Sequence, residues 1–416
     1  MTVIVAGAGI GGLVAGLSLA QASVDVRIFE AVRKIEPVGV GINILPHAVR
    51  ELFELGLEKQ LLAAGVQTAA LAYFSKRGQE IWREPRGRAA GYNWPQISIN
   101  RGTLQQILLD AAMERLGPER IATGHQLVDW RETGGIEATF LRREDNERVK
   151  VSGNLLIGAD GINSTVRAKL YSDEGPPIWN GAVLWRGVTR GRAILDNRSM
   201  IMAGHEFQKF VCYPIAPQQA GEPVINWIAE LKFEPGHVWR REDWNRKGDF
   251  ADFLPQFESW RFGWLDVPEL VHASGGCFEY PMVDRDPLPK WTHGRATLLG
   301  DAAHAMYPIG SNGASQAILD ARVLAREIRA RGEVPEALEA YETERRPATS
   351  AIVLANRRNG PEQVMQLVEE RAPQGFARIG DVLAREELED VAASYKKVAG
   401  FTIAELNARP PILGST

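Results

Sequence analysis

The chain has 416 residues, of which 45% are hydrophobic and 24% are charged, and its formal net charge is -4. This composition is typical of a globular enzyme, and the length allows two or three domains. The small negative charge argues against a nucleic-acid role, and no apolar stretch reaches the roughly 18 residues of a membrane span. Cys212 and Cys277 have no metal-ligand spacing, so we expect a cytoplasmic protein without disulfides or a metal site.

The N-terminal part begins with a β-α-β pattern. Residues 2–6 are a short apolar run that ends at a glycine, residues 11–21 have the periodicity of a helix, and residues 24–29 are a second apolar run. The unit has about 30 residues, as in a mononucleotide-binding half. The sequence predicts further helices at 47–54 and 104–115 and strands at 121–126, 136–141 and 155–157.

The pattern changes between residues 176 and 291. Short β-type runs alternate there with loops, and eight of the 11 tryptophans occur in this segment. We predict a mostly antiparallel sheet with strands at 182–189, 210–215 and 224–231. A buried strand follows at 297–299, then helices at 313–331 and 335–356, and the tail beyond residue 360 has a weak helical pattern.

These elements predict an α/β fold, α+β overall, with a Rossmann-like nucleotide-binding domain, an inserted antiparallel-sheet domain and a C-terminal helical region. The first domain is expected to comprise residues 1–175 and 292–360. The inserted domain is expected at 176–291 and the C-terminal region at 361–416.

The turn between the first strand and the first helix reads Gly7-Ala-Gly9-Ile-Gly-Gly12. Gly7 allows a tight turn, Gly9 lets a pyrophosphate approach the backbone, and Gly12 lets the helix pack closely on the sheet. Glu30 ends the second strand, where a ribose hydroxyl needs an acceptor. A glycine-rich turn without a ligand is the alternative, and this fingerprint by itself does not separate NAD from FAD.

Three later features favour FAD. A buried strand runs into Asp160-Gly161 and a helix start, although an Asp in this place is also a common helix cap. Asp301 ends the late strand, where a carboxylate accepts hydrogen bonds from the ribitol of flavin, and a helix beginning near Gly313 offers N–H groups to the flavin pyrimidine edge. Arg101 and Gln105 begin another helix within reach of a diphosphate or ribose, unless Arg101 is a solvated surface charge.

With these residues the chain resembles the flavoprotein aromatic hydroxylases, the single-component FAD monooxygenases typified by para-hydroxybenzoate hydroxylase. The three family motifs occur in order at residues 7–12, 158–167 and 300–315. The chain is particularly similar to the phenazine-carboxylate hydroxylases of pyocyanin biosynthesis. The segments that carry this second resemblance are residues 39–46, 84–102, 184–189 and 280–291.

The motifs and the resemblance together define the residues expected to bind FAD. Leu127 is expected to contribute its backbone to the adenine half, and Ser315 stands where many members of the family have Asn. The full expected set is Gly7, Gly9, Ile10, Gly11, Gly12, Glu30, Ala31, Gly41, Arg101, Gln105, Leu127, Asp160, Asp301, Gly310, Ser311, Asn312, Gly313, Ala314 and Ser315.

The resemblance implies a tightly bound FAD, transient NADH or NADPH, and O2 as co-substrate. A second dinucleotide fingerprint is absent from the sequence, which agrees with transient binding of the pyridine nucleotide. Oxygen transfer by a flavin C4a-hydroperoxide requires a dry site and a well-placed aromatic ring rather than an acid–base triad, so no catalytic residue is assigned.

The predicted substrate is an aromatic or N-heteroaromatic compound, phenazine-like and possibly carboxylated. Trp185, Arg186, Tyr213 and Trp227 lie on the predicted strands of the inserted domain, and Arg186 is suited to a carboxylate. Packing within the sheet is the alternative for each of them. His47 and His304 flank presumed flavin segments, where we expect structural histidines.

Two other functions remain open from the sequence: an FAD-dependent oxidoreductase that does not insert oxygen, and a flavin-binding protein without turnover. The expected partner is a small aromatic molecule, with no nucleic acid or membrane. The protein is expected to be a monomer or a homodimer.

Overall fold

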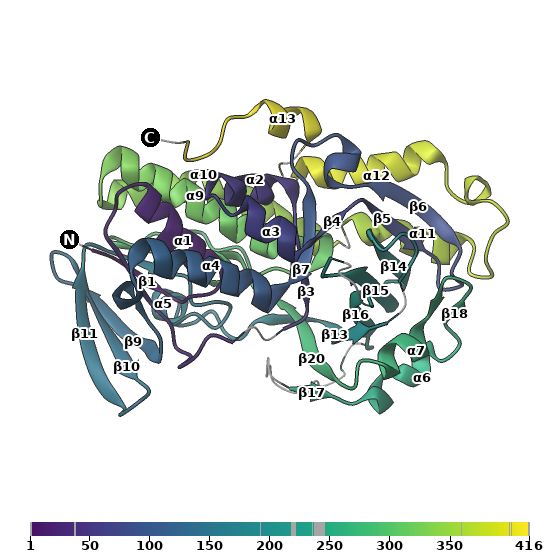
Figure 1. The fold of residues 1–416 in the computed structure, drawn as a ribbon, viewed down its shortest axis with the longest axis horizontal. Helices are drawn as coiled ribbons and strands as arrows, with labels where there is room; N and C mark the ends of the chain where they lie inside the picture. The colour runs from purple at the N-terminus through teal and green to yellow at the C-terminus, as the bar shows by residue number, and fades with distance from the viewer. Residues whose placement is uncertain are drawn as a thin grey trace.

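The computed structural model describes residues 2–36, 39–191, 193–217, 222–234, 236, 246–358, 360–398, 400 and 402–414. A parallel sheet and a larger mixed sheet form two halves that lie side by side (Figure 1). The parallel sheet has the order β21-β12-β1-β2-β8. Its strands are Ala296–Leu298 (β21), Leu155–Gly158 (β12), Val3–Ala6 (β1), Val26–Phe29 (β2) and Ile121–Ala122 (β8).

Helices pack against this parallel sheet to form the largest apolar core. Helix α1 (Ile10–Gln21) packs between α4 (Arg101–Leu116) and α9 (Gly313–Arg331), and α10 (Pro335–Asn356) packs on α9. All four residues of β1 are buried, as expected for a central parallel strand with helices on its faces. The predicted β-α-β unit and both late helices are therefore confirmed.

Two small antiparallel sheets extend this half. One has the order β11-β10-β9 and comprises Glu147–Gly153, Ile136–Arg142 and His125–Glu132. The other joins β3 (Gly41–Ile44), β7 (Gln96–Asn100) and β4 (Val66–Thr68), next to helices α2 (Pro46–Glu54) and α3 (Glu58–Ala64). The single strand predicted at 121–126 is wrong in extent, because β8 ends at Ala122 and β9 begins at His125.

The larger sheet has the order β17-β20-β13-β16-β15-β14-β5-β6 and is antiparallel except where β14 pairs with β5. Its strands are Lys247–Gly248 (β17), Cys277–Asp284 (β20), Ile178–Arg190 (β13), Val224–Lys232 (β16), Gln208–Pro214 (β15), Ser199–His205 (β14), Ala70–Phe74 (β5) and Glu80–Pro85 (β6). The last two strands come from the N-terminal segment of the chain, so this sheet is not built from residues 176–291 alone.

Each face of the larger sheet is covered by a different segment. One face packs on Phe253 and Phe257 and on α6 (Leu254–Phe257) and α7 (Val267–His272). The other face packs on α11 (Gln363–Arg371), with α12 (Arg385–Val398) nearby in the C-terminal region. This region also contains η5 (Gly360–Glu362) and α13 (Ile403–Ala408). Helix α13 is drawn in yellow in Figure 1.

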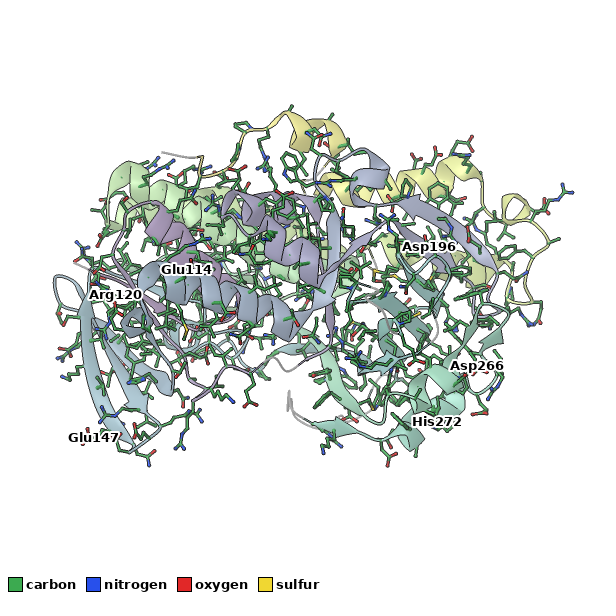
Figure 2. The ribbon with its side chains drawn as sticks, in the orientation of Figure 1. Glu114, Arg120, Glu147, Asp196, Asp266 and His272 are labelled. Atoms are coloured by element: carbon green, nitrogen blue, oxygen red, sulfur yellow. The ribbon has the colours of Figure 1, made fainter. Side chains whose placement is uncertain are left out.

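Charged side chains lie on the outside of both halves, for example Glu147 on the parallel-sheet half and Asp196 on the other (Figure 2). Among the described residues, no helix is both long and apolar enough to cross a membrane.

Candidate FAD and substrate site

The turn between β1 and α1 has the geometry that its glycines predict. Gly7 has φ +106°, and a Cβ there would lie 2.3 Å from the carbonyl oxygen of Ala159. A Cβ on Gly12 would lie 2.0 Å from the carbonyl oxygen of Gly7, so α1 touches the strand at this point. In contrast, a Cβ on Gly9 would meet no heavy atom within 4 Å. The backbone at Gly9 therefore faces open space, as the approach of a pyrophosphate requires.

Glu30 and Gln105 brace this turn from two other elements. The Glu30 carboxylate, just after β2, accepts hydrogen bonds from the backbone N–H of Ala8 at 2.7 Å and of Val32 at 2.9 Å. Gln105 on α4 donates from Nε2 to the carbonyl oxygen of Ala8 at 2.8 Å. Both side chains are thus held beside the phosphate turn, which leaves the carboxylate oriented for a ribose hydroxyl.

The other residues expected near the adenine half are less constrained. Arg101 is the first residue of α4 and its side chain is exposed. Ala31 directly follows Glu30 and is half-buried. Leu127 buries its side chain in the core of β9, opposite Phe140 of β10, so only its backbone is suited to a ligand.

Asp160 acts as a helix cap in this structure. Its carboxylate accepts hydrogen bonds from the Ser164 hydroxyl and from the Thr165 N–H at 2.7 Å, at the start of α5 (Thr165–Leu170). Burial raises the pKa of Asp160, against these hydrogen bonds. The structural alternative weighed for Asp160 therefore accounts for its side-chain contacts.

The sheet register brings Asp301 to the same edge as the phosphate turn. Strand β12 pairs in parallel with both β1 and β21, so the loops after all three strands leave one edge of the sheet. A Cβ on Gly11 would lie 2.8 Å from Leu299 Cδ2, which shows that the first and last loops adjoin. Asp301 begins α8 (Asp301–His304) with an exposed carboxylate that has no hydrogen-bond partner among the described residues.

In the turn before α9, at residues 309–312, the backbone is better placed than the side chains to meet a ligand. Gly310 and Ser311 have φ values of +68° and +57°. Asn312 donates from its buried side chain to the carbonyl oxygen of Gly310 at 3.3 Å. The Ser315 hydroxyl is also buried and accepts from the backbone N–H of Leu45 at 3.1 Å, so it braces the β3–α2 junction. The N–H groups along 310–314 remain the part of this turn suited to a flavin edge.

A buried ionic network supports both late loops, and the sequence reasoning missed it. Asp320 on α9 bonds to His304 Nε2 at 2.5 Å, Arg345 Nε at 2.7 Å and the N–H of Gly300 at 3.2 Å. Burial acts to raise the pKa of Asp320, but the bonds to His304 and Arg345 outweigh it and the pKa is lowered. His304 is thus a structural histidine, as expected.

Arg167 is a second buried support that the sequence did not reveal. It donates at 3.0 Å to the carbonyl oxygens of both Ala302 and Ala303, and it pairs with Glu174. The second motif is therefore tied to the Asp301 loop. A charged residue inside a predicted helix was the only available signal for this contact.

The four residues expected to contact substrate divide between the two faces of the larger sheet. Trp185 and Trp227 are fully buried on the face covered by α6 and α7, where Trp185 stacks on Phe253 at 5.0 Å between ring centroids. Trp227 donates from Nε1 to the Thr189 hydroxyl at 3.1 Å. These positions favour sheet packing for both tryptophans and do not support a substrate contact.

Arg186 and Tyr213 lie on the opposite face. Next to Arg186 on β13, Leu184 of this face meets Tyr307 and Ile309, which belong to the loops at 305–312 that we call the flavin loops. Tyr213 is buried farther along the face, in the apolar cluster that packs on α11.

Arg186 donates to the carbonyl oxygen of Gly41 at 2.8 Å, and its guanidinium lies 5.9 Å from the centre of the Tyr280 ring. Arg186 forms no ion pair with an acidic residue in the part of the chain that the structure describes. Gly41 also donates to Asn226 Oδ1 at 2.6 Å, so it joins the two halves of the site.

The residues present fit an extended FAD molecule. The open backbone at Gly9, the oriented Glu30 carboxylate and the exposed Asp301 carboxylate lie along one edge of the parallel sheet. The backbone turn at 310–314 adjoins this edge through α9 and offers N–H groups where a reduced flavin carries negative charge.

Comparison with known proteins identifies the family. A model described as "FAD binding domain" matches residues 1–179 and 282–356. The chain is 46% identical over 361 residues to a phenazine 1,6-dicarboxylic acid hydroxylase, PhzS, from Lysobacter antibioticus, with 85% of this chain and 89% of that protein covered. The chain belongs to this family of FAD-dependent aromatic hydroxylases.

Further relatives of this FAD-dependent hydroxylase agree. An aurachin C monooxygenase/isomerase from Stigmatella aurantiaca is 32% identical, over 86% of this chain and 89% of the relative. A solved salicylate hydroxylase substrate complex is 21% identical with a TM-score of 0.75, covers 100% of this chain and 98% of that chain, and supports the fold. The prediction of an FAD-dependent aromatic monooxygenase that uses NAD(P)H and O2 is confirmed at the level of the family.

Proposed function

We propose that this FAD-dependent hydroxylase acts on a phenazine-like aromatic carboxylic acid. The observation that carries the proposal is Arg186, a half-buried cation without an acidic partner in the described part of the chain, on the sheet face that meets the flavin loops. A partly desolvated, uncompensated cation favours an anionic ligand group. The similarity to a phenazine dicarboxylic acid hydroxylase supports the choice of ring system.

The chain would hold FAD through four elements. The N-terminus of α1 and the open backbone at Gly9 would bind the pyrophosphate, and Glu30 would accept from the adenosine ribose. Asp301 would accept from the ribityl hydroxyls, and the N–H groups of 310–314 would contact the pyrimidine edge. When bound and reduced by NAD(P)H, FAD supplies the activated oxygen.

The substrate-binding groups orient the ring and exclude water. Arg186 would hold the substrate carboxylate, with Tyr280 stacked against the guanidinium. An apolar cluster of Leu184, Met282, Tyr307 and Ile309 lies between this cation and the flavin turn. Such a dry floor protects an oxygen-transfer reaction from water and holds a flat ring in one position.

We also propose that the pyridine nucleotide binds transiently, that the protein acts in the cytoplasm on a small molecule, and that it is a monomer or a homodimer. The specific support for transient binding is that FAD would occupy the one dinucleotide fingerprint recognised in the sequence.

The test is a coupled measurement on the purified yellow protein. With phenazine-1-carboxylate present, NAD(P)H oxidation should accelerate, and oxygen uptake should match hydroxylated product mole for mole. NAD(P)H oxidation with full release of hydrogen peroxide and no product would indicate an oxidoreductase that does not insert oxygen. A flavin that NAD(P)H never reduces, with any aromatic acid, would indicate a binding protein and refute the proposal.

A further inference from the structure

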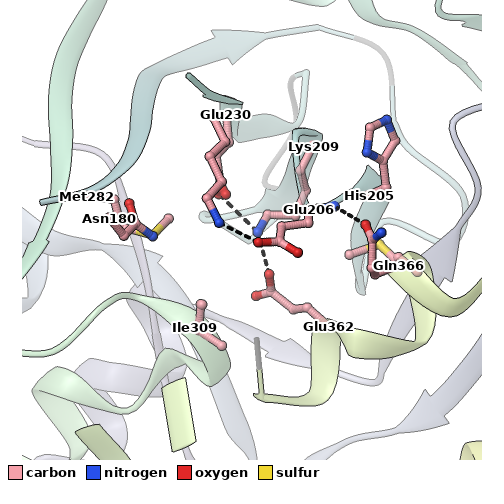
Figure 3. A pocket seen from close by; sticks show the side chains of 11 residues that line it. Asn180, His205, Glu206, Lys209, Glu230, Met282, Ile309, Glu362 and Gln366 are labelled. Carbon is pink, nitrogen blue, oxygen red and sulfur yellow. Dashed lines mark hydrogen bonds and ion pairs between the residues drawn. The ribbon is translucent and has the colours of Figure 1, made fainter. Parts of the chain in front are cut away.

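A second polar site lies on the same sheet face as Arg186, at the far side of the apolar cluster. Lys209 on β15 bonds to Glu230 on β16 at 3.0 Å and to Glu362 of η5, and all three side chains are buried (Figure 3). They line a hollow together with Ile309 and Met282, which also belong to the apolar cluster. We call Lys209, Glu230 and Glu362 the buried trio.

The space open to the centre of a water molecule in this hollow is about 20 Å³, which is room for about one water molecule and not for a substrate. The buried trio therefore holds no substrate in its own hollow, and it adjoins the apolar cluster through Ile309 and Met282. Its place relative to Arg186 follows from the strand register. Arg186 is paired with Ile228, whereas Glu230 is paired with Leu184 and with Lys209. Arg186 and Glu230 thus lie about 7 Å apart along the strands and about 5 Å across them.

On this sheet face, the surroundings of the buried trio and those of Arg186 differ in charge. The hollow is lined by two lysines, Lys209 and Lys232, and by three acids, Glu206, Glu230 and Glu362. Burial raises the pKa of Glu230, against its pairing with Lys209, so this end of the sheet face carries no excess positive charge. Burial lowers the pKa of the neighbouring His205, so this histidine adds no positive charge near neutral pH. Both lysines at this end are already paired with acids, whereas Arg186 has no acidic partner among the residues that the structure describes.

We propose that the buried trio is a specificity-determining wall, which directs a single substrate carboxylate to Arg186 and disfavours a second carboxylate at the opposite end of the ring system. This inference rests on the proposed function and narrows it to monocarboxylated rings. Like charges at short range in a partly dry site repel each other strongly, because little solvent screens them.

Ligand binding to the FAD-loaded enzyme tests the proposal. The probes are phenazine-1-carboxylate and phenazine-1,6-dicarboxylate, and the readout is each dissociation constant from perturbation of the flavin absorbance. The wild type should bind the monocarboxylate about tenfold more tightly. Glu362→Gln should narrow this ratio, and Glu230→Gln with Glu362→Gln should abolish or invert it, because Lys209 then lacks a counter-charge.

Glu389→Gln, in an exposed pair with Arg385 on α12, is the control and should leave the ratio unchanged. Tighter or equal binding of the dicarboxylate by the wild type would overturn the inference. So would a ratio that stays within twofold in the single and double variants. If both acids bind and are hydroxylated but the ratio does not move, the proposed function stands and this inference fails. If neither acid binds or is turned over, both fail.

Discussion

The positive charge of Arg186 is not balanced by an acidic residue in the part of the chain that the structure describes. Arg186 donates to the carbonyl oxygen of Gly41, bonds to the side chain of Tyr213 and lies over the ring of Tyr280. These neutral groups leave its net charge in place. The neighbouring Trp185 points to the other face and is fully buried. One strand thus supplies a core residue, Trp185, and the proposed carboxylate-binding residue, Arg186, in consecutive positions, as the two-residue period of a strand requires.

Replacing Arg186 with Gln should raise KM for carboxylated substrates by about 10- to 100-fold, since a charge-assisted hydrogen bond contributes about 1.5–3 kcal/mol. Steady-state kinetics with an aromatic acid and its uncharged analogue measure the effect. Arg190→Gln, at the exposed end of the same strand, is the matched control. Equal losses on both ligands would remove the carboxylate-binding role.

Asp301→Ala should weaken FAD binding by about tenfold or more, because we propose the exposed carboxylate as the acceptor for the ribityl hydroxyls. The flavin-to-protein ratio after gel filtration gives the result. Asp110→Ala, on the exposed surface of α4, should retain full flavin content. An unchanged ratio in the Asp301 variant would contradict its assigned role.

His47 makes the stability depend on pH. Burial, followed by the nearby charges of Arg345, Arg409 and Arg50, lowers the pKa of His47 from 6.5 to about 3. The unfolded chain therefore binds a proton between these values that the folded chain does not, so this residue lowers the stability as pH falls below 6.5. At pH 4.5 the cost to the free energy of unfolding is about 3 kcal/mol.

Urea unfolding at pH 7 and pH 4.5 tests this contribution. His47→Gln should lose less stability than the wild type between the two pH values, whatever its stability at pH 7. An identical loss in both proteins would show that His47 is protonated in the folded state.

In the β1–α1 turn, one glycine is needed for helix packing and another is proposed to lie against the cofactor. Gly12 lies where helix and strand touch, at 2.0 Å between its virtual Cβ and the Gly7 oxygen, whereas Gly9 faces open space. Substitution by alanine should therefore disturb the packing of α1 at Gly12 and the binding of the cofactor at Gly9.

Gly9→Ala should preserve the melting temperature of the apoprotein but reduce flavin content severely, because the added methyl group occupies the approach of the pyrophosphate. Gly12→Ala should lower the melting temperature of the apoprotein itself. Differential scanning fluorimetry and flavin absorbance distinguish the two. Full flavin content in the Gly9 variant would exclude a phosphate site at this turn.

The C-terminal tail joins distant parts of the molecule. Arg50 donates to the carbonyl oxygen of Arg409 at 2.9 Å, and Leu413 is fully buried in the core of the parallel-sheet half. Arg50 also pairs with Glu51, and both side chains are completely buried. The tail therefore satisfies a charge that would otherwise be left partly unpaired.

Deletion of residues 402–416 should lower the free energy of unfolding by about 3 kcal/mol or more, since it uncovers buried apolar surface and an internal ion pair. Chemical denaturation measures the loss. Arg409→Ala keeps the backbone carbonyl and should cost much less. Equal stability of the truncated and complete chains would show that the tail is not part of the folded core.

The sequence was sufficient for features that depend on local order. The β1–α1 turn, the Asp301 loop and α9 were predictable because glycines and strand ends have fixed geometric roles. The incorporation of β5 and β6 into the larger sheet was not, since pairing between β14 and β5 depends on contacts across more than a hundred residues.

The sequence also could not predict which face of β13 lies toward the flavin loops. Alternation predicts that Trp185 and Arg186 point in opposite directions, but which of them meets the flavin loops depends on the segment that covers the other face. The buried pairing of Asp320 with Arg345 also required the relative placement of α9 and α10.

The parallel register of β1, β12 and β21 has a consequence for biosynthesis. Strand β21 begins at Ala296, so a nascent chain emerging from the ribosome has its phosphate turn long before the opposite end of the cofactor cradle has been translated. An FAD site that uses both the phosphate turn and Asp301 can therefore form only after β21 and the start of α8 have been synthesised.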